Sequence, residues 1–259
     1  MKTIIIVQSR MTSTRLPGKV LLPLAGEPML MRLMERLRRV QRADGIVIAT
    51  TTNVTDDPIA AMCAQQGVPC HRGSELDVLS RYADAARLHA ADVVVRITSD
   101  CPLIDPALID QLIAVYEEGD SDYVSNMLPP TWPYGMAVEV FSATALAQAH
   151  AEATQDAERE HVTPFIYWHP QRYRLRNVAS PVALSHHRWT VDTPEDYELV
   201  RRLFDHLLPT NPHFTQADVL ALLDAHPDWI AINQHVQQKP ATEDRKSTRL
   251  NSSHIAVSR

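Results

Sequence analysis

Glycine is scarce in this chain of 259 residues, where it occurs only seven times. The scarcity excludes two common phosphate-binding loops. A dinucleotide-binding loop needs three closely spaced glycines, and the first apolar segment is followed by Gly18 alone. A P-loop needs a glycine five residues before its Gly-Lys pair and a Ser or Thr after the lysine, whereas Ser13 and Val20 hold those positions. Any phosphate site in this chain is therefore built differently.

Cysteines, long apolar runs and blocks of basic residues are also lacking. The three cysteines, Cys63, Cys70 and Cys101, show no CxxC spacing, which predicts reduced thiols and no cysteine metal centre. No apolar stretch reaches the length of a membrane span or of a signal sequence, so we expect a cytoplasmic protein without a membrane partner. The net charge of −6, with no long Lys/Arg run, argues against nucleic acid as the main partner. Local cations must then hold any nucleotide.

Such cations follow the first predicted strand. Residues 4–7 (IIIV) form a short β-branched run, typical of a buried parallel strand. Residues 8–19 (QSRMTSTRLPGK) then carry Arg10, Arg15, Lys19, three hydroxyls and a Pro-Gly pair. Ligands of open α/β sheets bind at the carboxyl ends of strands, and cations with free N–H groups suit a polyphosphate. The loop predicts a nucleotide site.

Strand-like and helix-like segments alternate through the rest of the chain. We expect strands at residues 45–50, 69–74 and 92–98 and helices at 29–40, from 56, from 77, near 106, at 152–160, 196–208 and 215–225. This order predicts a single doubly wound, Rossmann-like α/β domain with a mostly parallel sheet. We expect it to span residues 1–238, with a small inserted substructure at 120–175. Residues 239–259 are expected to be a disordered tail, non-native from about 245.

Two carboxylates follow strand-like segments. Asp100 comes directly after residues 92–98, and Asp105 is better placed to cap the next helix. Mg²⁺ prefers oxygen ligands and bridges phosphates, so Asp100 is a candidate metal ligand. Asp192 precedes Thr193, which fits a helix N-cap and leaves Asp192 available for chemistry.

These residues together resemble a known family. The run from Gln8 to Lys19, with residues 24–28 (LAGEP), is similar to the signature loop of the sugar-activating cytidylyltransferases. This family includes CMP-acylneuraminate and CMP-Kdo synthetases and, closest to this chain, the spore-coat polysaccharide type. The resemblance covers about residues 1–235. It implies transfer of CMP from CTP to a sugar or sugar acid with release of pyrophosphate, a requirement for Mg²⁺, and a homodimer.

The resemblance also implies roles for individual residues. Arg15 and Lys19 would hold the leaving phosphates, and Asp100 and Asp192, the latter in a VDTPED motif, would hold Mg²⁺; these four are the catalytic candidates. The nucleotide-binding candidates are Gln8, Ser9, Arg10, Ser13, Arg15, Gly18, Lys19, Thr51, Arg72, Asp77 and Arg96. The acceptor-binding candidates are Gly135, Glu139 and His161.

Several alternatives stay open from the residues alone. Arg72 and Arg81 either contact the ligand or are surface cations, and the threonines at 50–52 fit a turn equally well. Glu139 either contacts the acceptor or a cation, or faces solvent, and His161 also fits a buried structural histidine. The whole chain has two alternative functions. A GT-A-like glycosyltransferase would need a DxD motif, which residues 100–102 (DCP) do not provide, and the other is a non-catalytic nucleotide-binding protein.

Overall fold

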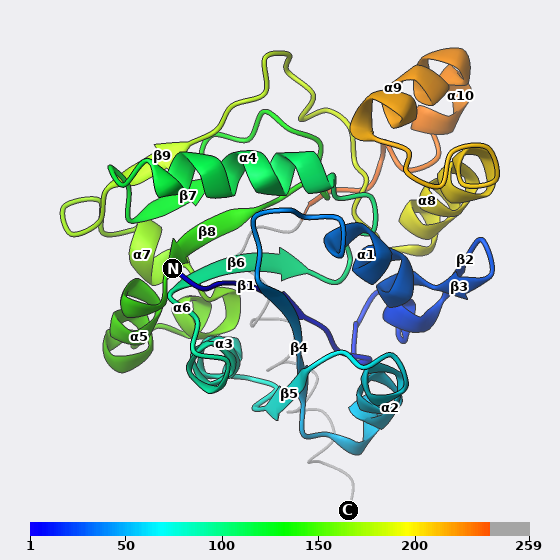
Figure 1. Cartoon of the computed structure of the whole chain (residues 1–259). Helices are drawn as coiled ribbons and strands as arrows, with labels where there is room; N and C mark the ends of the chain where they lie inside the picture. Colours follow the sequence, from blue (N-terminus) through cyan, green and yellow to red (C-terminus); the bar gives the residue numbers. More distant parts are fainter. Residues whose placement is uncertain (239–259) are drawn as a thin grey trace, which may run out of the picture.

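The computed structural model describes residues 1–238, so the expectations for 239–259 lie outside the described residues. Its core is a seven-stranded sheet of order β5-β4-β1-β6-β8-β7-β9 (Figure 1). All neighbouring strands are parallel except that β8 is antiparallel to both β6 and β7. The strands are β1 Thr3–Gln8, β4 Gly45–Thr51, β5 Cys70–Gly73, β6 Val93–Thr98, β7 Tyr123–Ser125, β8 Glu139–Ser142 and β9 Leu175–Asn177. The predicted mostly parallel α/β fold is confirmed.

Helices cover both faces of this sheet (Figure 1). The first layer contains η1 Lys19–Leu21, α1 Met29–Leu37, η2 Val54–Asp56, α2 Asp57–Gln65, α4 Pro106–Glu117, α8 Pro194–Leu207, α9 Gln216–Ala225 and α10 Pro227–Ile230. A separate hairpin, formed by β2 Pro23–Leu24 and β3 Glu27–Pro28, lies on the same side. The second layer contains α3 Val78–Leu88, α5 Ala143–Glu152, α6 Asp156–His161 and α7 Pro164–Tyr167. No helix within residues 1–238 is long and apolar enough to cross a bilayer.

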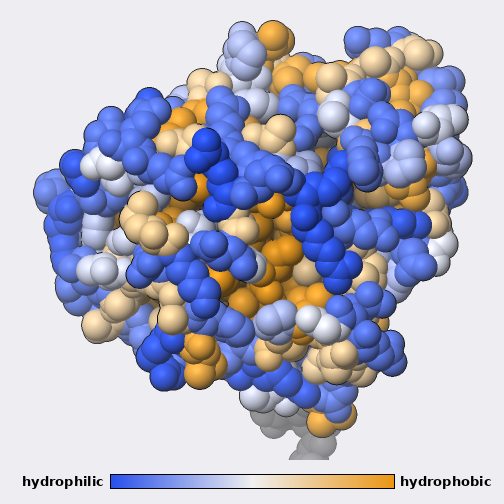
Figure 2. Space-filling view, in the orientation of Figure 1, coloured by the Kyte–Doolittle hydropathy of each residue, from blue (hydrophilic) through white to orange (hydrophobic). Residues whose placement is uncertain are grey.

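Two hydrophobic cores lie on opposite faces of the sheet because side chains alternate along each strand. In β1, Ile5 and Val7 pack under the first helix layer, whereas Ile4 and Ile6 pack under the second. The face drawn in Figure 2 is mostly hydrophilic, and hydrophobic residues gather near its centre. The carboxyl edge of the sheet, between the two layers, is where the loops after β1 and β6 meet.

The predicted helix at 152–160 is wrong in its extent. Helix α5 ends at Glu152, Ala153 is extended, and α6 begins at Asp156 with a capping box between Gln155 and Glu158. The buried Glu158 carboxylate accepts hydrogen bonds from the backbone N–H groups of Thr154 and Gln155. This cap starts a new helix at Asp156. The acidic segment therefore forms parts of two helices rather than one continuous helix.

The segment at 120–175 contributes two strands to the main sheet. β7 and β8 extend it beyond β6, and α5, α6 and α7 cover the second face. Of residues 135–140, only Glu139 and Val140 belong to β8, which continues to Ser142. This segment thereby supplies one wall of the pocket described next.

Candidate active site

A polar pocket opens at the carboxyl ends of β1 and β6. Both strands end in the pocket, and the loop after β1 crosses it. Residues from α3 and α6 complete the lining. The lining residues are Gln8, Ser9, Arg10, Ser13, Thr14, Arg15, Lys19, Val78, Arg81, Thr98, Ser99, Asp100, Glu160, His161 and Asp192.

The centre of this pocket is the ammonium group of Lys19. Its Nζ lies 3.0 Å from Asp100 Oδ2, 2.9 Å from Asp192 Oδ1 and 2.7 Å from the carbonyl oxygen of Val191. These three acceptors match the three N–H donors of an ammonium group. Arg15 Nη2 lies 3.0 Å from the other oxygen, Asp192 Oδ2. One lysine therefore joins two carboxylates that are far apart in the sequence.

The charges in this cluster stabilise one another. Burial opposes ionisation of both Lys19 and Asp100, but their mutual attraction outweighs it. The two carboxylates raise the pKa of Lys19 above its ordinary value. The Lys19 ammonium, with hydrogen bonds from Thr98 and Cys101, lowers the pKa of Asp100 to about 2. Both groups are therefore charged at neutral pH.

The loop before Lys19 is held by backbone hydrogen bonds. Gly18 has a φ of +71°, which a residue with a side chain rarely adopts, and its N–H donates to the Met11 carbonyl over 2.9 Å. The Met11 N–H in turn donates to Asp56 Oδ1 over 2.8 Å. Gly18 thus acts through the shape of the turn rather than through contact with the pocket.

Asp56 occupies the N-cap position of α2, but its side chain makes no capping hydrogen bond. Its fully buried carboxylate also accepts hydrogen bonds from the hydroxyls of Thr50 and Thr51 and from the Thr51 N–H. Asp57 forms an ion pair with Arg72 over 2.7 Å. Asp56 and Asp57 therefore connect the ends of β1, β4 and β5. The Asp56 carboxylate binds these tertiary partners instead of capping α2.

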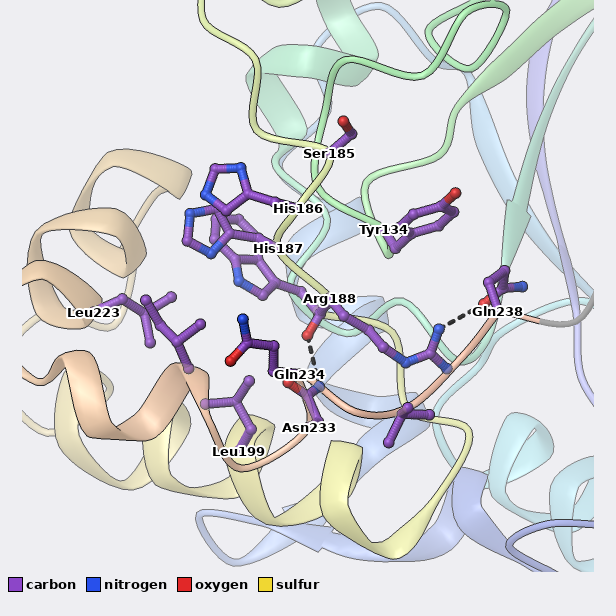
Figure 3. A pocket seen from close by; sticks show the side chains of 13 residues that line it. Tyr134, Ser185, His186, His187, Arg188, Leu199, Leu223, Asn233, Gln234 and Gln238 are labelled. Atoms are coloured by element: carbon purple, nitrogen blue, oxygen red, sulfur yellow. Dashed lines mark hydrogen bonds between the residues drawn. The ribbon is translucent and has the colours of Figure 1, made fainter.

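A buried network of ion pairs and hydrogen bonds holds the Asp192 side chain in place. Arg188 Nη2 lies 3.0 Å from Asp192 Oδ2, and Arg188 Nε lies 2.9 Å from Asp196 Oδ1. Asn233 Nδ2 donates to the carbonyl oxygen of Arg188 and to Asp196, and Arg188 Nη1 donates to Gln238 Oε1 (Figure 3). The C-terminal segment of the described chain therefore helps to orient an active-site carboxylate.

A second, smaller pocket lies on the far side of Arg188 (Figure 3). His186 and His187 line it outside any strand, and their ring centroids are 4.1 Å apart. The two imidazole rings pack against each other, whereas on a strand they would point to opposite faces. No group of three or more metal-ligating side chains occurs among residues 1–238.

The structure brings most of the predicted residues together and places others outside the pocket. Those lining it are Gln8, Ser9, Arg10, Ser13, Arg15, Lys19, Asp100, His161 and Asp192. Those that do not line it are Gly18, Thr51, Arg72, Asp77, Arg96, Gly135 and Glu139.

Three of the excluded nucleotide candidates have structural partners. Thr51 binds Asp56, and Arg72 donates to the carbonyl oxygens of Thr51 and Asn53. Asp77 caps α3 by accepting a hydrogen bond from the Ser80 N–H over 2.9 Å. These contacts shape the strand ends around the pocket.

Glu139 and Arg96 form a buried pair beneath the pocket. Glu139 binds Arg96 and accepts hydrogen bonds from the hydroxyls of Tyr123, over 2.6 Å, and Thr163, over 2.5 Å. Glu139 therefore meets a cation, one of the alternatives left open, and does not face solvent. Arg96 Nη2 also donates to Gln8 Oε1 over 3.1 Å, which connects the pair to the pocket wall.

Gly135 is required by a close approach of two backbone segments. Its φ is +102°, and a Cβ atom there would lie 2.5 Å from the backbone nitrogen of Thr190. This glycine lets the loop after β7 pack against the segment that leads to Asp192. Its role is to shape the site.

Sequence reasoning did not select several lining residues. Arg81 had been left open between ligand contact and surface exposure, and it is in fact buried. Glu160 had only its position next to His161 as a signal. Thr98 and Ser99 end strand β6 beside Asp100, a place where polar residues at a strand end signal a site.

The two carboxylates are suited to a divalent cation. Asp100 and Asp192 direct one oxygen each at the same positively charged group, the Lys19 ammonium. A metal ion there would have two protein ligands and would need water or phosphate oxygens for the rest, a pattern that Mg²⁺ favours. The donor set fits a metal bound together with a nucleotide.

A parallel α/β sheet with a cationic loop and two carboxylates at its carboxyl edge defines a nucleotidyltransferase type of site. The family model described as "Cytidylyltransferase" matches residues 4–223, and the chain belongs to this family.

Relatives extend over almost the whole chain. The chain is 38% identical to the uncharacterized protein MJ1063 of Methanocaldococcus jannaschii, over 94% of this chain and 99% of the relative. It is 36% identical to the spore coat polysaccharide biosynthesis protein SpsF of Bacillus subtilis, over 86% and 94%. A solved cytidylyltransferase from Leptospira borgpetersenii superposes with a TM-score of 0.85 at 31% identity, over 93% of this chain and 99% of that one.

Proposed function

We propose that this protein transfers CMP from CTP to a sugar or sugar acid, with release of pyrophosphate, in the synthesis of surface polysaccharide precursors. The observation that carries the proposal is the cluster of Lys19, Asp100 and Asp192 beside Arg15. Family membership and the similarity to SpsF support the cytidylyl group and the polysaccharide context.

The reaction is an in-line displacement at the α-phosphorus of CTP. The acceptor oxygen forms a bond to the α-phosphorus and loses its proton to solvent, while the bond from the α-phosphorus to the bridging oxygen breaks and pyrophosphate leaves with that oxygen. Arg15 and Lys19 neutralise the charge on the leaving pyrophosphate, and the remaining lining residues hold both substrates in line. To contact phosphate oxygens, Lys19 must exchange part of its contact with the carboxylates.

We propose that Asp100 and Asp192 hold Mg²⁺ when the nucleotide is bound. The Lys19 ammonium lies between the two carboxylates, which shows that this position suits a cation. Bound there, Mg²⁺ would polarise the phosphate and offset its developing charge. Arg188 keeps Asp192 oriented whether Lys19 or a metal is its partner.

The candidate binding residues divide by distance from the pocket. Gln8, Ser9, Arg10 and Ser13 line it and are proposed to contact the nucleotide, and His161 to contact the acceptor. The candidates outside the lining are proposed to act by shaping the strand ends: Gly18, Thr51, Arg72, Asp77, Arg96, Gly135 and Glu139.

We also propose a cytoplasmic homodimer. Leu128, Trp168 and Leu175, all within residues 120–175, are large hydrophobic side chains with more than a third of their surface exposed, which suits a protein interface. Three free cysteines suit a reducing compartment. Sedimentation equilibrium tests the dimer, and a monomer at micromolar concentration would contradict it.

The proposed function is tested by thermal stabilisation and pyrophosphate release. A ligand at 100 times its Kd adds about 2.7 kcal/mol, which raises the melting temperature by a few degrees. We expect a shift with CTP and Mg²⁺ that exceeds the shifts with UTP, ATP and GTP, and pyrophosphate release only when an acceptor is added. No shift with any of the four nucleotides would rule out the transferase.

A further inference from the structure

A cavity outside the candidate active site lies between α1 and the segment that joins α8 to α9. Its volume is about 400 Å³, within the range of about 300–1,000 Å³ that is usual for small-molecule sites. It is lined by Arg32, Glu35 and Arg36 of α1, by Arg39 and by several residues between 204 and 214. None of its lining residues lines the polar pocket at the carboxyl ends of β1 and β6. We call this space the α1 cavity.

Positive charge is in excess at the α1 cavity, although the whole chain carries a net charge of −6. Its lining contains the guanidinium groups of Arg32, Arg36 and Arg39 and the carboxylate of Glu35. Glu35 pairs with Arg32 over 2.9 Å, which leaves the charges of Arg36 and Arg39. Within residues 1–238, neither of these two arginines belongs to an ion pair.

Arg36 is held firmly, but its charge is not neutralised by a carboxylate in contact with it. Its side chain is 3% exposed, and its guanidinium donates to backbone carbonyl oxygens, among them that of Phe214 over 3.0 Å. Burial and the neighbouring charge of Arg39 lower the pKa of Arg36 to about 10, although Asp105 and Asp218 attract its charge. Two arginines that repel each other favour an anion close to both.

Arg39 is the cation whose guanidinium is available to a ligand. It follows the end of α1 and is half-buried, and its backbone N–H donates to the carbonyl oxygen of Arg36 over 3.0 Å. Within residues 1–238, its side chain has no hydrogen-bond acceptor. A guanidinium has five N–H donors in a planar arrangement, which match the oxygens of a phosphate group.

The other side of the α1 cavity is apolar. Phe204 and Leu208, at the C-terminal end of α8, line it together with Phe214. The ring of Phe214 packs edge-on against that of Phe204, with centroids 5.3 Å apart, and the guanidinium carbon of Arg36 lies 4.3 Å from its centroid. A ligand can therefore bury an apolar or planar body here while its charged group meets Arg39.

We propose that the α1 cavity is a second ligand site, which binds a small organic phosphate with an apolar or planar body. The two arginine charges without a paired carboxylate match a phosphate monoester, whose charge is about −1.5 to −2 at neutral pH. Guanidinium groups bind phosphate oxygens through charge-assisted hydrogen bonds. This site is separate from the proposed transferase reaction and does not depend on it.

Isothermal titration of the full chain with phenyl phosphate, in a buffer without phosphate, tests the proposal. We expect phenyl phosphate to bind equally well with and without saturating CTP and Mg²⁺, because its site lies outside the polar pocket. Arg39→Gln should weaken binding by about tenfold or more, since a charge-assisted contact with the phosphate is lost. Arg39→Lys should recover part of the affinity, because it restores the charge without the planar donors.

Control variants and control ligands separate this site from general attraction to basic residues. Arg42→Gln, at an arginine outside the cavity that pairs with Glu117 over 2.6 Å, is the matched control and should leave binding unchanged. Arg10→Gln, in the polar pocket, should also leave it unchanged. Inorganic phosphate lacks the apolar body and should bind about tenfold more weakly, and uncharged phenol should show no binding.

Each contrary result overturns the proposal. These results are no binding of phenyl phosphate by the wild type, equal affinity in Arg39→Gln and the wild type, or equal affinity for inorganic phosphate and phenyl phosphate. Loss of binding in the presence of CTP or in Arg10→Gln would place the phosphate in the polar pocket instead. An equal loss of affinity in Arg42→Gln and Arg39→Gln would reduce the contact to general attraction by the basic residues around α1.

Discussion

At the scale of single residues, Lys19 decides the electrostatics of the site. Its ammonium group separates two carboxylates that would otherwise repel each other, and it faces the place where the leaving phosphates are proposed to bind. The same side chain thus stabilises the two carboxylates and is proposed to take part in the reaction.

Replacing Lys19 with alanine is expected to lower kcat/KM by about 100-fold or more. One charge contact in the transition state is worth about 2.7 kcal/mol, which corresponds to that factor. Pyrophosphate release measures the rate, and Lys2→Ala, at an exposed lysine, is the control. A wild-type rate in Lys19→Ala would remove Lys19 from the mechanism.

At the scale of elements, the start of α8 determines where Asp192 lies. Thr193 accepts a hydrogen bond from the Asp196 N–H, and the Asp196 carboxylate accepts from the N–H groups of Asp192 and Thr193. The reciprocal cap fixes the backbone on both sides of the active-site carboxylate. Helix α9 has the same kind of cap, at Thr215 and Asp218, away from the pocket.

Thr193→Ala and Thr215→Ala form a matched pair. Each loses an N-cap, which costs about 1 kcal/mol, so each should lower the melting temperature by about 2–4 °C. Only Thr193→Ala should also lower kcat, because only that cap positions Asp192. Equal activity in the two variants would show that the α8 cap does not orient the site.

Tyr82 attaches α3 to the sheet and makes this attachment sensitive to alkali. Its hydroxyl lies 3.2 Å from each of two carbonyl oxygens, those of Ile6 in β1 and Ile97 in β6. Burial raises the pKa of its fully buried hydroxyl to about 12, above the ordinary value of 10. A raised pKa means that the contribution of this group is complete below pH 10 and is lost as the pH rises from 10 towards 12.

The free energy of unfolding of the wild type should therefore exceed that of Tyr82→Phe at pH 8, by about 1 kcal/mol for the lost hydrogen bonding. The difference should shrink by about 1.4 kcal/mol per pH unit above pH 10, because phenylalanine cannot ionise. Urea unfolding at a series of pH values measures it. A constant difference up to pH 12 would contradict the raised pKa.

At the scale of the whole molecule, the site exists because two helix layers meet at one edge of the sheet. Both hydrophobic cores are formed by residues between Ile4 and Leu223, and Trp229, Ile230 and Ile232 pack against the first core. The contact between Arg188 and Gln238 links the end of the described chain to the site.

A chain that ends at Gln238 should keep both its melting temperature and its stabilisation by CTP. That chain keeps every described residue of the two cores and of the network around Asp192. A chain that ends at Ile230 is the contrasting variant, since it lacks Asn233 and Gln238 and should lose activity before it loses the fold. A large drop in melting temperature for the chain ending at Gln238 would place essential contacts beyond it.

Local patterns were enough to predict much of the fold. The strand, loop and helix at the start of the chain, the cap at Thr193 and the cap at Asp105 follow from neighbours within a few residues, so composition and spacing predict them. The helix at 152–160 failed for a related reason, because the cap formed by Gln155 and Glu158 was not recognised.

The position of Asp100 after β6 and the cations of the first loop were determined by the sequence itself, since each depends on residues next to it. The strand expected before Asp192 is not formed, because that segment makes only an isolated bridge from Arg188 to Tyr134. Only the tertiary structure decided which charges meet. Lys19 reaches carboxylates 81 and 173 residues away, Glu139 pairs with Arg96 inside the protein, and Arg81 is buried with its Nε and Nη1 atoms unpaired. The physical reason is that alternation along a strand determines which face a side chain points to, whereas its partner depends on which distant element covers that face.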